Sequence, residues 1–61
     1  MLLKKLENNG EIRATYSSSN IVSSIYDRAT KALTIIFTNG GQYKYSDASL
    51  TDYTRFELAD S

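Results

Sequence analysis

The stretch "ALTIIFTNGGQYKY", residues 32–45, decides how this chain folds. Its first half is rich in β-branched and aromatic residues, which is typical of a β-strand. The "NGG" at residues 39–41 contains residue types that tolerate the backbone angles of a tight turn. The "QYKY" that follows runs back along the first strand, so the sequence predicts an antiparallel hairpin.

Two pairings of this hairpin are open, and they place Tyr43 and Tyr45 on different faces of the sheet. A two-residue loop puts the tyrosines on the face that carries Thr34, Ile36 and Thr38. A three-residue loop, residues 39–41, places Phe37 opposite Tyr43 and Ile35 opposite Tyr45. We favour the second pairing because it gathers large apolar side chains on one face, where a helix can cover them. These side chains are Leu33, Ile35, Phe37, Tyr43 and Tyr45.

The residues before this hairpin predict more strands. The segment "NIVSSIYD", residues 20–27, has the β-branched and aromatic content of a strand. Further upstream, Asn9-Gly10 is a turn pair that favours a hairpin within "LLKKLENNGEIRATY". The arm before this turn also fits a helical turn, so its structure stays open. We therefore expect three to four strands in an antiparallel meander.

The hydrophobic period changes after the meander. Ser49 and Asp52 have the spacing of a capping box, with the shorter acid in the second position. Tyr53, Phe56 and Ala59 then recur every three residues and form an apolar stripe. The sequence predicts an α+β domain in which one C-terminal helix packs on one face of the sheet. Within it, residues 1–17 form an N-terminal hairpin or extension, and residues 18–61 form the meander and helix.

The chain is short and lacks the usual covalent or metal reinforcements of small proteins. It has 61 residues and neither cysteine nor histidine. A chain of this size buries only about 60% of its unfolded surface, so its stability is marginal. Because disulfides and Cys/His metal sites are excluded, we expect a homo-oligomer or a complex with a larger protein. The longest apolar run is "LTIIF", so we expect no membrane segment and a cytoplasmic location.

The chemistry of the side chains favours binding over catalysis. Without histidine, the usual general base near neutral pH is missing, and no nucleophile stands at a recognisable spacing from a base. The acids are scattered, so we expect no metal, and the sequence has no glycine pattern for a phosphate or dinucleotide cofactor. We therefore expect a non-enzymatic binding module with no cofactor.

Charge divides unevenly along the chain although the total is zero. Residues 1–45 carry six basic and three acidic residues, whereas residues 46–61 carry one basic and four acidic residues. A neutral chain gains little affinity for nucleic acid from counterion release. The uneven distribution can instead orient one face toward a charged partner.

Two interpretations of the tyrosines remain. Tyr43 and Tyr45, with Lys44 between them, can form a platform that stacks nucleic-acid bases. They can equally be half-buried side chains that fill a small core. A second candidate is "SSSN", whose backbone N–H and hydroxyl groups can bind an anion. The candidate ligand-binding residues are Tyr43, Lys44, Tyr45, Ser18, Ser19, Asn20 and Arg28.

Residues 18–61 resemble the KTSC domain, a small bacterial and phage module also found at the C-terminus of some lysyl-tRNA synthetases. The matching pieces are "SNI" at 19–21, "YD" at 26–27, the alternation of Leu33, Ile35 and Phe37, the "NG" at 39–40, Tyr43, Tyr45, Tyr53, Phe56 and "ADS" at 59–61. Ser49 stands where the family usually has proline. The family continues beyond "ADS", so we expect either a short natural form or a fragment that lacks the C-terminal end.

The resemblance implies no established activity. The synthetase context implies an RNA-binding role, so the ligand we expect first is RNA or a nucleotide. The alternative is a protein-binding inhibitor or adaptor that acts through an exposed sheet edge or an oligomer interface. Such a protein fits a phage counter-defence role in the host cytoplasm.

Overall fold

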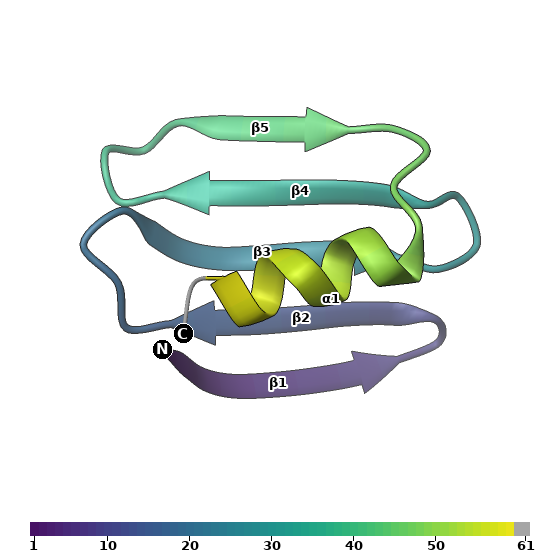
Figure 1. Cartoon of the computed structure of the whole chain (residues 1–61), viewed down its shortest axis with the longest axis horizontal. Helices are drawn as coiled ribbons and strands as arrows, with labels where there is room; N and C mark the ends of the chain where they lie inside the picture. The colour runs from purple at the N-terminus through teal and green to yellow at the C-terminus, as the bar shows by residue number, and fades with distance from the viewer. Residues whose placement is uncertain (60–61) are drawn as a thin grey trace.

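The computed structural model describes residues 1–59 as one antiparallel sheet followed by one helix (Figure 1). The sheet has the order β1-β2-β3-β4-β5, so each strand pairs with the next one along the chain. The elements are β1 (Leu2–Asn8), β2 (Glu11–Tyr16), β3 (Ile21–Asp27), β4 (Ala32–Phe37), β5 (Gln42–Tyr45) and α1 (Leu50–Ala59). The expected α+β class is confirmed.

The sheet has five strands rather than the expected three to four. The segment before Asn9 forms strand β1 and not a helical turn, because it pairs with β2 along the register from Lys4–Thr15 to Asn8–Glu11. Asn9 and Gly10 have φ angles of 53° and 80°. These positive angles are those of the tight two-residue hairpin that the Asn-Gly pair predicts. The first hairpin is therefore part of the main sheet.

In the β4–β5 hairpin the side chains lie on the predicted faces of the sheet, but the residues pair differently from the prediction. Ile35 lies opposite Tyr43 and Leu33 opposite Tyr45, so the expected pairs of Phe37 with Tyr43 and Ile35 with Tyr45 are wrong. The reason is the loop, which comprises residues 38–40 instead of 39–41: the N–H of Phe37 donates to the carbonyl of Gly41 at 2.9 Å. The left-handed position falls on Gly40, with φ 90°. A shift of two residues keeps each side chain on its face, which is why the facing is right.

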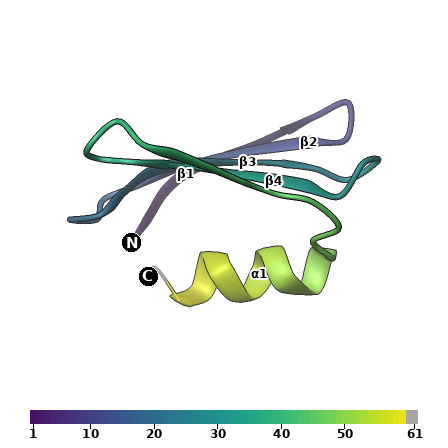
Figure 2. The ribbon, with the colours of Figure 1, turned by 90° about the horizontal axis from the view of Figure 1, so that it is seen from above.

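Helix α1 covers one face of the sheet and leaves the opposite face open (Figure 2). It begins with the predicted capping box, in which the N–H of Ser49 donates to Asp52 Oδ2 and the N–H of Asp52 donates to Ser49 Oγ, both at 3.1 Å. Tyr53 is buried and Phe56 is partly buried, as the apolar stripe predicts. Ala59 is exposed, because the stripe extends past the contact with the sheet.

The core lies between α1 and the middle strands. Its buried residues are Ile12, Tyr26, Leu33, Ile35, Ala48 and Tyr53. The rings of Tyr26 and Tyr53 stack with centroids 5.0 Å apart and planes 11° apart. The Tyr26 hydroxyl donates to the carbonyl of Ala48 at 2.6 Å, so β3 holds both the helix and the segment that leads into it.

We predict that Tyr26→Phe destabilises the fold by about 1–3 kcal/mol, because it leaves the carbonyl of Ala48 buried without a donor. Chemical denaturation measures the change in the free energy of unfolding. Tyr45→Phe is the matched control, since it removes a hydroxyl from a half-exposed ring and should change stability by less than about 0.5 kcal/mol. Equal stability of the two variants would contradict the anchoring role of Tyr26.

Candidate functional site

The position of α1 leaves part of its own face of the sheet uncovered. In Figure 1 the helix runs along β2 and β3, while β4 and β5 lie to one side of it. Tyr43 is 60% exposed and Tyr45 48% exposed, although both lie on the helix-facing side. The two tyrosines therefore do not belong to the core, and the sequence interpretation that places them under the helix is wrong on that point.

A hollow of about 390 Å³ lies between β5 and α1, and we call it the β5–α1 groove. Leu33 and Ile35 of β4 line it from the sheet, and Phe56 lines it from the helix. The other lining residues are Tyr45, Ser46, Asp47, Ala48 and Asp52. The groove thus combines an apolar lining with polar groups from the turn and the helix start, the usual composition of a ligand site.

The aromatic surface continues from the groove along β5. The ring of Tyr43 lies 6.5 Å from that of Tyr45, with their planes 36° apart. On its other side, Tyr43 meets Phe37 edge-to-face at 5.2 Å and 89°. Three rings therefore form one row that runs along β5, from Phe37 beside the hairpin loop to Tyr45 at the end of the strand. Partly exposed rings of this kind offer apolar area together with a hydroxyl that can reach a partner.

The charged groups that line the groove are acidic. Asp47 and Asp52 carry carboxylates there, and no lysine or arginine among residues 1–59 lines the groove. The backbone N–H of Ser49 donates to the Asp52 carboxylate and holds the pKa of that carboxyl below its usual range. The Ser49 hydroxyl lowers this pKa further, and the charge of Arg55 lowers it by a smaller amount. Asp47 has no hydrogen bond or ion pair among residues 1–59, and its φ of 59° is left-handed. The free carboxylate of Asp47 is therefore available to a ligand.

Strand β5 forms an edge of the sheet with free backbone groups. Phe37 and Gly41 form a hydrogen-bonded pair, and such pairs recur at every second residue of an antiparallel ladder. Tyr43 and Tyr45 therefore direct their backbone groups toward β4. Gln42 and Lys44 direct theirs away from the sheet, toward any strand that would pair with β5.

The structure brings together only part of the site expected from the sequence. Tyr43 and Tyr45 are neighbours, but Lys44 lies on the opposite face because side chains alternate along a strand. The Arg28 side chain forms an ion pair with Glu7 at 3.1 Å. Arg28 comes directly after the last residue of β3, whereas residues 18–20 come before its first residue, so the two lie at opposite ends of that strand.

The serine-rich loop at residues 18–20 joins the neighbouring hairpin loop. Ser18 Oγ accepts the N–H groups of Asn20 and Ile21 at 3.1 and 3.3 Å, so it closes its own turn. The carbonyls of Ser19 and Asn20 accept the hydroxyl and N–H of Thr38 at 3.1 and 2.8 Å. These bonds give the loop a structural role, and residues 18–20 are not among the residues that line the β5–α1 groove.

Sequence reasoning missed Asp47, Asp52 and Phe56 as residues of one site. The excess of acids after residue 45 was visible, and it was the one signal that pointed there. Asp47, Asp52 and Phe56 lie close to Tyr45 only because of the path of the turn between β5 and α1, and no residue pattern predicts that path. Asp60 and Ser61, which end the "ADS" match, lie outside the described residues.

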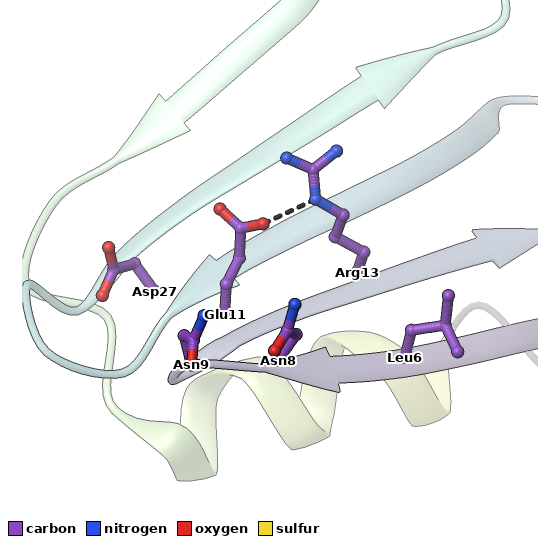
Figure 3. A pocket seen from close by; sticks show the side chains of 6 residues that line it. All are labelled: Leu6, Asn8, Asn9, Glu11, Arg13 and Asp27. Carbon is purple, nitrogen blue, oxygen red and sulfur yellow. Dashed lines mark hydrogen bonds and ion pairs between the residues drawn. The ribbon is translucent and has the colours of Figure 1, made fainter.

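A second hollow of about 520 Å³ lies on the face of the sheet away from α1, beside the β1–β2 turn (Figure 3). Its lining residues are Leu6, Asn8, Asn9, Glu11, Arg13 and Asp27. Arg13 Nε lies 2.6 Å from Glu11 Oε1, and a dashed line marks this ion pair in Figure 3. Asp27 Oδ1 accepts the N–H groups of Ala29 and Thr30. These charged groups already have partners, so this hollow is the weaker candidate.

A polar cluster lies beneath α1. Lys5 Nζ of β1 approaches Glu57 Oε2 of the helix at 3.2 Å, and it lies 5.8 Å from the ring centre of Tyr53. The hydroxyls of Tyr16 and Ser24 share a hydrogen bond of 2.8 Å next to them. Burial raises the pKa of Tyr53, and the neighbouring Glu57 carboxylate raises it further. The cluster joins the edge strand β1 to the helix.

This arrangement of a meander with one helix across it defines a small α+β module. A family model for the KTSC domain matches residues 17–61, which is most of the chain. The chain therefore belongs to the KTSC family, as its resemblance indicates. No curated protein and no solved structure matches it.

Among residues 1–59, no group of three His, Cys, Asp or Glu side chains lies close enough to hold a metal ion. Within the same residues, no helix has the length and apolarity needed to cross a membrane.

We predict that Tyr53 makes the fold sensitive to alkaline pH. A free tyrosine loses its proton near pH 10, whereas buried Tyr53 keeps its proton above that pH. The stability that depends on the neutral hydroxyl is therefore complete below about pH 10 and is lost as pH rises further. Denaturation of the wild type at several alkaline pH values should show a steeper loss than Tyr53→Phe. Tyr43→Phe, which alters an exposed ring, should keep the wild-type slope; equal slopes in all three would contradict the prediction.

Proposed function

We propose that this chain is a protein-binding module that takes an extended segment of another protein as an additional strand on β5. The observation that carries the proposal is the position of the β5–α1 groove directly beside an open strand edge. Peptide recognition by strand addition uses these two features together: the edge supplies backbone hydrogen bonds and the groove receives alternate side chains. An adaptor or an inhibitor can act in this way.

The edge and the groove supply different parts of the binding free energy. The backbone groups of Gln42 and Lys44 give hydrogen bonds that depend little on the sequence of the ligand. The row formed by Phe37, Tyr43 and Tyr45 gives apolar area that a ligand side chain can cover. Tyrosine is enriched at the centres of protein interfaces for this reason.

A proline at position 44 tests the role of the edge. We expect Lys44→Pro to abolish binding, because it removes an N–H that points away from the sheet and leaves the bonds between β4 and β5 intact. The matched control, Lys44→Ala, removes the same side chain and should bind like the wild type. The probes are capped nine-residue peptides of serine and threonine with two variable residues, two positions apart. Amide chemical shifts of β5 and α1 report binding.

Three outcomes would overturn this proposal. The first is that no peptide of the panel shifts the amides of residues 42–45. The second is that Lys44→Pro binds as well as Lys44→Ala while keeping its fold. The third is that the wild type self-associates in sedimentation and Lys44→Pro does not, which would assign the β5 edge to a second copy of this chain.

A second candidate ligand is single-stranded RNA, because Tyr43 and Tyr45 present exposed, adjacent rings. Stacking of a base on such a ring contributes roughly 1–3 kcal/mol. The free carboxylate of Asp47 and the opposite facing of Lys44 weigh against a polyanion. If RNA binds, oligouridine should quench tyrosine fluorescence at low salt, and the quenching should weaken steeply as salt rises. An unchanged signal at low salt would exclude this candidate.

A further inference from the structure

We infer that the segment captured on β5 carries a basic residue two positions before an aromatic one. This inference rests on the proposed function and adds the chemistry and direction of the ligand. It follows from the alternation of side chains along an added strand and from the different surroundings of Tyr45 and Tyr43.

The alternation selects which residues of the ligand meet the groove. Because Gln42 and Lys44 offer the free backbone groups, they form the hydrogen-bonded pairs with an added antiparallel strand. Ligand residues opposite Tyr43 and Tyr45 then occupy the pairs without hydrogen bonds, where side chains lie closest together. Two ligand side chains, at positions i and i+2, thus share the face of the groove.

The residue opposite Tyr45 meets an acidic surrounding. Tyr45 lines the groove together with Asp47 and Asp52, and no basic side chain of the described part of the chain lines it. Asp47 has no other partner among the described residues, so a ligand cation meets a carboxylate that no internal ion pair occupies. A long basic side chain can also lie along the ring of Tyr45 while its charge reaches Asp47. Charge complementarity therefore selects arginine or lysine at this position.

The residue opposite Tyr43 meets an aromatic surrounding. The ring of Tyr43 contacts Phe37 on one side and approaches Tyr45 on the other. No charged side chain takes part in these ring contacts, and the row continues into the apolar part of the core through Phe37. An aromatic side chain covers such a surface best, since edge-to-face and offset contacts add to the area it buries.

The direction of the ligand follows from the sheet. Every pair of neighbouring strands is antiparallel, and an added strand that continues this pattern runs from Tyr45 toward Tyr43. The basic residue therefore comes first along the ligand and the aromatic residue two positions later. A parallel strand would reverse this order, so the order itself is testable.

Three members of the peptide panel test the inference. The first carries Arg-Thr-Phe at its centre, the second Phe-Thr-Arg, and the third Gln-Thr-Phe. The first and second have the same composition and charge, so only direction separates them. We expect the Arg-Thr-Phe peptide to bind at least about tenfold more tightly than either of the others, which corresponds to about 1.4 kcal/mol.

Asp47→Asn tests the partner of the basic residue. Asparagine tolerates the left-handed backbone of this position, so the variant removes the charge and keeps the turn. It should bind the Arg-Thr-Phe and Gln-Thr-Phe peptides equally. Glu11→Gln removes one negative charge on the opposite face of the sheet and should keep the wild-type preference for arginine.

The outcomes separate this inference from the proposed function. If all three peptides shift the amides of β5 with equal affinity, strand addition stands and the inference falls. A preference for Phe-Thr-Arg overturns the direction and the inference with it. An arginine preference that survives in Asp47→Asn overturns the assignment of the carboxylate. If no peptide binds β5, both the proposed function and the inference are overturned.

Discussion

The rest of the structure depends on the stacking of Tyr53 on Tyr26. This contact places α1 over β2 and β3, and the hydrogen bond from Tyr26 to the carbonyl of Ala48 fixes where the chain turns toward the helix. A helix centred on β3 of a five-stranded sheet cannot also cover β5. The groove and the exposed tyrosines are therefore consequences of where the core places its largest rings.

The distribution of polar groups on the helix-facing side agrees with this geometry. Toward β1, the space beneath α1 is closed by the ion pair of Lys5 and Glu57. Toward β5, no side chain of the described helix makes an equivalent contact, and Phe56 instead lines the groove. One side of the helix is thus fastened to an edge strand and the other side is open. The asymmetry favours β5 over β1 as the edge that receives a partner.

Residue patterns predicted the local features of the fold and failed where distant segments meet. The first turn was predictable from Asn9-Gly10, because the φ angles that these residues tolerate act locally. The start of the helix was predictable from Ser49 and Asp52, because their hydrogen bonds span only three residues. The face of the sheet on which Tyr43 lies was predictable from the alternation of apolar side chains along β4, but the exposure of Tyr43 to solvent was not. Exposure depends on how far α1 reaches across the sheet, which is set by Tyr26 and Tyr53. The excess of acids after residue 45 was visible in the sequence, but the position of Asp47 and Asp52 at the groove depends on the turn between β5 and α1, which no residue pattern predicts.

The turn between β5 and α1 links stability to binding. It must reverse the chain so that Ala48 reaches the hydroxyl of Tyr26, and Asp47 takes a left-handed φ of 59° to allow this reversal. Glycine would satisfy the backbone at this position as easily, but it would carry no charge. Aspartate tolerates the same angle and also places a free carboxylate beside Tyr45. The residue that shapes the route into the helix thus gives the groove its charge.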